Sequence, residues 1–409
     1  MENRTALTYR YEKWRALSAG ILESASITFL LLVAVRWFKA GAMAKALIAS
    51  GGSLGLLFAP LTVSFVESRR WTTSAAASRM CLLGAGCFLV SALCPILPVF
   101  VACSLIGMAT FSGFIPLLTQ IYQENYPDNE RGRRFSRTIM IRIGTDVVFC
   151  YVAGRALDGH IEKFQILLFV YAAAFAFAAF CLSRIPSQPL ARAEGSRHPL
   201  RALRFAKTDR IFRLTLISWM FLGTGTLMMQ PLRVEYLANP KYGQGLSITA
   251  IAILTGVLPN AIRLVLSPLW GWLFDHLNFF ILRIVLNVGF MLGILAFFTT
   301  ETYSGLICGA IIYGISNAGG DVAWSLWVTK FAPPARVADY MSVHTFFTGV
   351  RGVIAPAISF HLAAGGISIV SLGWMCATTI FAGTLFLIPE IKLGRTARPG
   401  AALVEEISE

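Results

Sequence analysis

The residues of this sequence that could do chemistry are ionisable side chains inside long apolar stretches. Glu23 lies in one near the beginning, Asp146 in one further along, and Arg351 in one near the end. A charge at the centre of a membrane helix costs about 2.5–3.5 kcal/mol on insertion scales, so such charges rarely lack a role. We therefore expect these side chains to bind a solute or a coupling ion.

Carboxylates inside apolar stretches are the expected proton carriers, because burial makes their charged form less favourable. We expect Glu23, Asp146 and Asp321 to be the coupling residues. For Glu23, the alternative role of a structural hydrogen-bond partner near the cytoplasmic end of its span is equally supported. Asp321 follows a pair of glycines and is expected to couple ions or to pair with Arg263. A plain polar contact between helices explains Asp321 about as well.

Polar and basic groups inside the spans suit a polar or anionic solute. The expected substrate-binding residues are Arg351, Arg263, Asn260, Gln120 and Trp324. Asn260 and Arg263 are one helical turn apart, so they share a helix face. Gln120 and Trp324 belong to groups of neighbouring polar and aromatic side chains in the spans. Such groups more often pack between helices than bind a ligand.

Asp146 and Arg351 could form a pair between two halves of the chain. They are 205 positions apart (351 − 146), as are Arg131 and Arg336 (336 − 131). A lone buried charge is costly, and pairing offsets much of that cost. In the alternative, Asp146 pairs with Arg142, four positions away on one helix face, and Arg351 binds an anionic solute by itself.

The elements that must position these residues are membrane helices. Of the 409 residues, 56% are hydrophobic and 14% are charged, whereas a soluble domain has about 25% charged residues. A membrane helix needs roughly 20 mainly apolar residues. Candidate spans lie near residues 15–36, 42–66, 73–94, 96–121, 137–156, 164–183, 211–236, 247–274, 280–299, 304–329, 340–362 and 366–389, about twelve in all.

Lys and Arg gather in alternate gaps between these spans, as in residues 131–137. Such gaps face the cytoplasm, so we expect both termini on the cytoplasmic side of a bacterial inner (plasma) membrane. The longest and most basic gap divides the spans evenly. The expected organisation is a first helical bundle at 1–183, a cytoplasmic linker at 184–210, a second bundle at 211–390 and a cytoplasmic tail at 391–409.

Two short segments repeat between the halves. Pro60-Leu61 and Pro268-Leu269 are 208 positions apart (268 − 60), and the same shift carries Glu67 onto Asp275. Internal repeats of this kind are common in transporters. The repeat agrees with the even division of the spans and predicts two related bundles.

Three loops carry a resemblance to the major facilitator superfamily over nearly the whole chain. Residues 271–276 read GWLFDH and resemble the G-x-L-x-D loop signature of that family. Residues 126–133 (YPDNERGR) and 332–336 (APPAR) resemble its loops after the fourth and tenth spans. The resemblance implies an all-α membrane protein with two pseudo-symmetric six-helix bundles, a central cavity and alternating access. The expected gating residues in these loops are Asp275, Glu67, Arg131 and Arg336.

The first half departs from this pattern. Val63 stands where the loop signature has its leading glycine, and Glu67 replaces its aspartate. The fifth span also lacks the G-x-x-x-G-P pattern of many drug/proton antiporters of the family. This argues against multidrug efflux.

We expect a secondary transporter that moves a small polar or anionic organic solute with protons as the coupling ion. Export of lipids or of amphiphilic, drug-like compounds remains the alternative, suggested by the Phe- and Trp-rich spans. No paired-carboxylate, Ser/His or metal-ligand pattern predicts an enzyme, a cofactor or a metal site. The net charge of +14 lies in the loops without interleaved aromatic residues, so no nucleic-acid partner is expected beside the bilayer.

Overall fold

The computed structural model describes residues 2–189, 201–330, 332 and 337–392. The chain divides into two compact units, here called unit 1 and unit 2. Unit 1 comprises Met1–Pro199 and Arg233–Val257, and unit 2 comprises Leu200–Leu232 and Leu258–Glu409. The bundle boundaries drawn from the loop charges remain a prediction.

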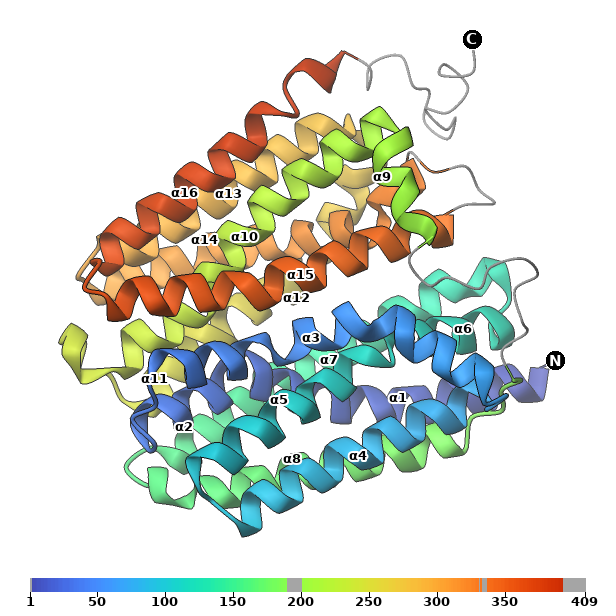
Figure 1. Ribbon diagram of the computed structural model, residues 1–409, viewed down its shortest axis with the longest axis horizontal. Coiled ribbons are helices and arrows are strands. Elements are labelled where there is room, and N and C mark those ends of the chain that lie inside the picture. Colours follow the sequence, from blue (N-terminus) through green and yellow to red (C-terminus); the bar gives the residue numbers. More distant parts are fainter. Residues whose placement is uncertain (1, 190–200, 331, 333–336, 393–409) are drawn as a thin grey trace. The chain divides into compact units, whose positions relative to one another are not determined.

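Unit 1 is built from long helices that lie side by side (Figure 1). Helix α4 packs along α8, α3 along α5, and α1 along α7. The elements are α1 (Glu2–Ser24), η1 (Ala25–Phe29), α2 (Leu30–Arg36), α3 (Ala42–Ser68), α4 (Thr73–Leu93), α5 (Leu97–Gly113), α6 (Ile115–Asn125), α7 (Asp128–Leu157), η2 (Ile161–Lys163), α8 (Phe164–Ser183), η4 (Pro240–Tyr242), α11 (Ile248–Ala252) and η5 (Ile253–Val257).

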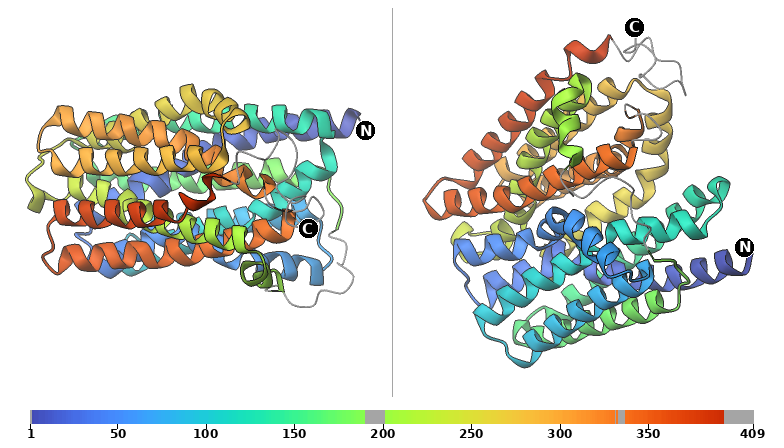
Figure 2. Two further views of the ribbon diagram at one scale, coloured as in Figure 1. Left: turned by 90° about the horizontal axis from the view of Figure 1, so that it is seen from above. Right: turned by 45° about the vertical axis from the view of Figure 1, so that its right-hand side comes forward.

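Unit 2 holds most of α10 and the helices from α12 onward, and Figure 2 shows its helices from two further directions. Helix α14 packs along both α13 and α12, and α16 packs along α13. The elements are η3 (Arg201–Arg204), α9 (Phe205–Thr208), α10 (Arg210–Ala238), α12 (Leu258–His276), α13 (Phe279–Thr299), α14 (Tyr303–Leu326), η6 (Trp327–Lys330), α15 (Val337–Ala364), α16 (Ile369–Leu385) and η8 (Pro389–Ile391).

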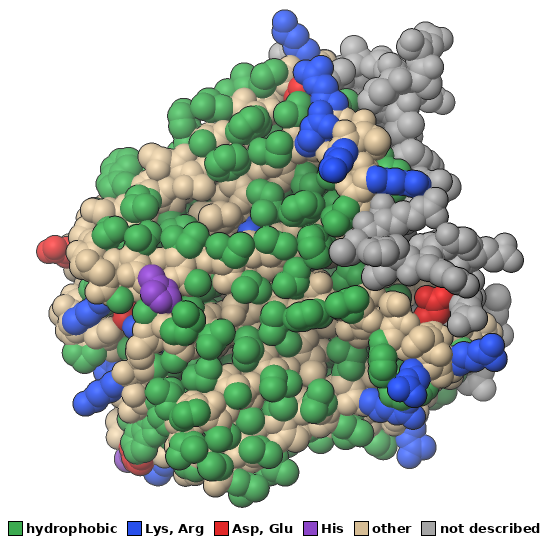
Figure 3. All heavy atoms as spheres, in the orientation of Figure 1, with side chains coloured by type: hydrophobic (Ala, Val, Ile, Leu, Met, Phe, Trp, Pro, Cys, Tyr) green, Lys and Arg blue, Asp and Glu red, His purple; other side chains and the backbone are tan. Residues whose placement is uncertain are grey.

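Helices of the described chain are long and apolar enough to cross a membrane in 10 places. Helix α16, with 17 residues, and α7, which carries charges within its apolar part, account for the remaining predicted spans. The prediction of an all-α membrane protein is confirmed. Apolar side chains cover much of the face in Figure 3, and Lys and Arg gather toward its edges.

The first span is longer than predicted, because helix α1 begins at Glu2 and not near residue 15. Two charges in its first half, Glu12 and Arg15, are buried and bonded to each other. Each therefore offsets part of the cost of burying the other, which lets the helix continue through a stretch that looks polar in the sequence.

Small residues set the close packing of neighbouring helices. A Cβ added at Gly309 of α14 would lie 2.6 Å from the backbone nitrogen of Phe297 in α13. Only glycine allows the two backbones to approach so closely, which is a common device in membrane helices. The glycines of the sequence thus act here as packing surfaces.

Candidate functional site

Unit 1 holds a carboxylate cluster between α1 and α7. Arg142 Nε lies 2.9 Å from Glu23 Oε2. Asp146, one turn further along α7, is fully buried, and Cys150 Sγ donates to its Oδ1 at 3.4 Å. A Cβ at Gly20 would lie 3.0 Å from the backbone nitrogen of Asp146, so the bare glycine lets α1 bring Glu23 close to α7. We call Glu23, Arg142 and Asp146 the α1–α7 cluster.

Two short π-helical segments border this cluster. Thr28 in η1 and Thr255 in η5 share a hydrogen bond of 3.0 Å between their hydroxyl oxygens. A Cβ at Gly256 would lie 2.6 Å from Cys150 Sγ, so η5 packs against the helix that bears Asp146. Single π-turns inside α-helices occur frequently at functional sites. Sequence periodicity gives no sign of them, and this feature was not predicted.

A second buried charged group lies nearer the beginning of α1. Arg15 donates to Glu12 through Nε at 2.7 Å, and the Tyr122 hydroxyl donates to Glu12 Oε1. Glu12 and Tyr122 come from α1 and α6. The sequence interpretation gave neither Arg15 nor Glu12 a role in a site. Their spacing of three positions was the available signal.

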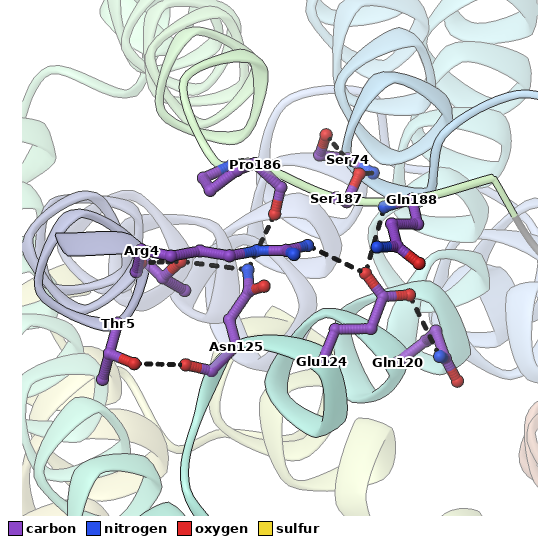
Figure 4. A network of polar contacts seen from close by, with 10 residues as sticks. Arg4, Thr5, Ser74, Gln120, Glu124, Asn125, Pro186, Ser187 and Gln188 are labelled. Atoms are coloured by element: carbon purple, nitrogen blue, oxygen red, sulfur yellow. Dashed lines mark hydrogen bonds and ion pairs between the residues drawn. The ribbon is translucent and has the colours of Figure 1, made fainter. Parts of the chain in front are cut away.

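The predicted binding residue Gln120 lies in a different network, shown in Figure 4. Its Nε2 donates to Glu124 Oε1 at 3.0 Å, and Glu124 also pairs with Arg4 and accepts from the backbone of Gln188. These contacts tie α1 and α6 to the segment after α8. They are structural links, and the structure does not bring Gln120 together with the α1–α7 cluster.

Polar contacts also hold residues 233–257 within unit 1. Lys45 Nζ donates to Glu235 Oε1 at 2.8 Å, and Asn239 Nδ2 donates to the same oxygen at 2.8 Å. Arg36 donates to the carbonyl of Leu246 at 2.9 Å. These bonds come from α3 and α2, so the segment after Leu232 is fastened to the N-terminal helices.

Asp158 fastens the beginning of α11 in the same way. Its carboxylate accepts from the backbone of Ile248 at 3.1 Å and from the Thr249 hydroxyl at 2.8 Å. Partial burial disfavours the charge, but these bonds and one from Ser247 outweigh it and hold the pKa of Asp158 below its usual value. The carboxylate therefore acts as an ionised cap of this helix.

Unit 2 holds an ion pair between α12 and α14. Arg263 Nε donates to Asp321 Oδ2, and Arg263 Nη1 also donates to Asn260 Oδ1 at 3.3 Å. The Arg263 side chain is 7% exposed, whereas that of Asp321 is 43% exposed. The structure thus brings together three of the predicted site residues, including the expected pair of Asp321 with Arg263.

Arg351 lies in a separate, aromatic part of unit 2. It donates to the backbone carbonyl of Trp219 and, at 3.2 Å, to the Thr348 hydroxyl. Trp324 Nε1 donates to the same hydroxyl at 3.4 Å. A Cβ at Gly223 would lie 2.6 Å from Arg351 Nη1, so this glycine of α10 makes room for the guanidinium. Arg351 and Trp324 are therefore neighbours, as two of the predicted binding residues.

Two further residues of this region were missed by sequence reasoning. Arg283, in the second turn of α13, is fully buried with its Cζ 3.5 Å from the centre of the Trp219 ring. His344 is fully buried among the rings of Trp219, Trp324 and Trp327. Neither ring nitrogen of His344 has a hydrogen-bond partner among the described residues.

Three of the predicted gating residues lie in described helices and belong to none of these clusters. Asp275 is exposed at the end of α12, and Glu67 is half-buried near the end of α3. Arg131 donates to the carbonyls of Tyr126 at 3.3 Å and Gln123 at 3.5 Å, which closes the end of α6. Arg336 lies outside the described residues. Gating by these four residues remains a prediction.

Asp146 belongs to unit 1 and Arg351 to unit 2, and their pairing remains a prediction. Within the α1–α7 cluster, the guanidinium of Arg142 forms its 2.9 Å ion pair with Glu23. Among the residues that the structure describes, no three His, Cys, Asp or Glu side chains are grouped to hold a metal ion.

The helices and the charges within them define a polytopic membrane protein with polar sites inside its spans. A sequence profile of the Major Facilitator Superfamily matches residues 69–356, more than half of the chain, and the chain belongs to this superfamily. It is a membrane transporter and not an enzyme. No curated protein sequence matches it.

Solved structures of the same fold agree with this assignment. A variant of the nucleoside transporter NupG has a TM-score of 0.76 and 16% sequence identity, over 93% of this chain and 99% of that one. A D-xylose-proton symporter has a TM-score of 0.70 and 16% identity, over 96% and 99%. A bacterial homolog of the human lysosomal transporter Spinster has 0.65 and 12%, over 96% and 95%.

Proposed function

We propose that this protein is a proton-coupled transporter of a small, polar and uncharged organic solute. The observation that supports it most is the exposed carboxylate of Asp321. Its side chain is 43% exposed and its partner Arg263 only 7%, although both lie within helices long and apolar enough to span a membrane. A carboxylate cannot remain in contact with lipid at this depth without a large cost.

The exposed face of Asp321 is therefore best explained by water, on the path of a polar solute. Because Asp321 already balances Arg263, the pair presents hydrogen-bonding groups without a net charge. Asn260 adds an amide beside it. The Asp321–Arg263 pair and this amide suit the hydroxyl and amide groups of a neutral solute better than they suit a solute that carries a carboxylate. Of the two predicted kinds of solute, polar or anionic, we therefore propose the polar, uncharged kind.

The α1–α7 cluster supports protons as the coupling ion. Arg142 pairs with Glu23 and precedes Asp146 by one turn of α7, and both carboxylates interact electrostatically with the thiol of Cys150. Neighbouring carboxylates repel each other, and binding a proton to one of them relieves the repulsion. Taking up and releasing that proton is the chemistry required of a coupling site.

The solved relatives suggest which solutes to test first. Their titles name a nucleoside transporter and a D-xylose-proton symporter. Nucleosides and pentoses are neutral, rich in hydroxyl groups and of a size that one membrane site can enclose. We propose this class as the substrate, with both termini cytoplasmic as the Lys and Arg distribution of the loops predicts.

The proposal is tested with purified protein in liposomes under an imposed proton gradient. We expect uptake of a radiolabelled nucleoside or pentose, accompanied by proton movement that a pH-sensitive dye inside the liposomes reports. The variant Asp321→Asn should lose uptake, whereas Thr378→Ala, on an exposed face of α16, should retain it. Transport of lysolipids in place of these solutes, or uptake that ignores the proton gradient, would contradict the proposal.

A further inference from the structure

The aromatic region of unit 2 contains buried basic side chains that face no carboxylate. Arg283 and His344 are fully buried, and Arg351 is 6% exposed. Among the described residues, no carboxylate forms an ion pair with any of the three. We call Arg283, His344 and Arg351, with the indole rings of Trp219 and Trp327, the arginine–tryptophan cluster.

Hydrogen-bond donors of this cluster lack acceptors. No described residue accepts from Arg283 Nε, Nη1 or Nη2, or from Arg351 Nε. The indole nitrogen of Trp219 is likewise buried without a partner among the described residues. A guanidinium has donors only and stays charged in proteins, so its unmade bonds are costly. Donors of several helices thus gather where the chain supplies no acceptor.

The charges aggravate this cost. Arg283 and Arg351 are close enough to repel each other, and both act on His344. The ring of Trp219, 3.5 Å from Arg283 Cζ, offers a cation–π contact that is worth about 2 kcal/mol when desolvated. This is small beside the several kcal/mol that burying each ion costs. The fold needs a negative charge here.

We propose that the arginine–tryptophan cluster binds a small inorganic monoanion, of which chloride is the natural example. The donors of Arg283, Arg351 and the Trp219 indole would surround it, and its charge would balance one guanidinium. A monoanion fits better than a dianion, because the Born cost of desolvation grows with the square of the charge and is about fourfold greater for a dianion. The site is distinct from the solute and proton sites proposed above.

Gly223 offers a way to disturb the site without removing a charge. An added Cβ would lie 2.6 Å from Arg351 Nη1, so Gly223→Ala must displace the guanidinium. By contrast, a Cβ at Gly86 of α4 meets nothing within 4 Å. The pair of variants separates the position of Arg351 from the general effect of an added methyl group.

The test is the thermal unfolding of purified protein in detergent, with chloride replaced stepwise by gluconate at constant ionic strength and pH. We expect Tm to rise with chloride and to saturate, as mass action requires of a bound ligand. Bromide should act likewise. Arg283→Gln should abolish the rise, and Gly223→Ala should weaken the apparent affinity by about tenfold or more.

Two controls are matched to these variants. Arg15→Gln, which changes a buried arginine that already has a carboxylate partner, should keep the full chloride response, and so should Gly86→Ala. A Tm that is indifferent to the anion, or an equal response in Arg283→Gln, would overturn the proposal. If Arg283→Gln does not fold, ³⁵Cl line broadening by the wild-type protein decides: we expect broadening that bromide competes away, and its absence overturns the site.

Discussion

Buried arginines in the two units differ in what faces them. In unit 1, the buried Arg15 is bonded to Glu12, and Arg142, whose side chain is 33% exposed, lies 2.9 Å from Glu23. In unit 2, Arg263 has Asp321, but Arg283 faces the ring of Trp219 and has no acceptor among the described residues. A buried charge needs a counter-charge. Where the chain provides a carboxylate as the counter-charge, that carboxylate can also exchange a proton. Where the chain provides none, a bound anion must supply the negative charge.

The largest expected effect concerns the carboxylates of unit 1. Glu23→Gln or Asp146→Asn should abolish solute accumulation against a gradient, because an amide mimics the protonated acid but cannot release the proton. Exchange of labelled for unlabelled solute across liposomes should continue, since it needs no net proton movement. Full uphill transport in both variants would show that neither acid carries the proton.

Glu12→Gln would turn a partnered arginine of unit 1 into one like Arg283. Breaking a buried pair from one side costs about 3–5 kcal/mol in soluble proteins, so we expect a large fall in Tm or expression. Glu124→Gln, whose partner Arg4 is 33% exposed, should cost only about 0–1 kcal/mol. Equal losses of stability in the two variants would mean that burial does not make the Glu12–Arg15 pair more important for stability than the Glu124–Arg4 pair.

Replacing a buried arginine by methionine should change the stability of the protein in opposite directions in the two units. In chloride-free buffer, Arg283→Met removes buried donors without acceptors and should raise stability by about 1–3 kcal/mol. Arg15→Met leaves Glu12 buried without its partner and should lower the stability by a similar amount or more. Thermal unfolding of both proteins measures the difference. The same sign for both would remove the distinction between the regions.

The smallest expected effect is the pH dependence of the Asp158 cap. Its pKa is lower in the folded protein, so its contribution is complete above the ordinary pKa of about 3.9 and is lost as pH falls through the folded value. Asp158→Asn should therefore lower Tm at neutral pH, and the difference from wild type should shrink toward about pH 3. A constant difference across this range would argue against an ionised cap.

Sequence reasoning reached the fold and one contact of the site, and stopped at features that depend on helix packing. Apolar stretches of sufficient length predicted the membrane helices, and Asp321 paired with Arg263 as expected. Arg283 stands near a helix end, where a basic residue normally marks topology. Its burial against Trp219 depends on how α10 and α13 pack, which hydropathy does not reveal. The same limit hid the acceptor-poor setting of His344.

The comparison of the two regions can be tested directly by crystallography with bromide in place of chloride. The account predicts one anomalous peak within hydrogen-bond distance of Arg283 and Arg351, and none at Arg15, Arg142 or Arg263, because these already have carboxylate partners. A map without a peak at Arg283, collected at a bromide concentration that saturates the thermal response, would contradict it. So would equal peaks at the partnered arginines.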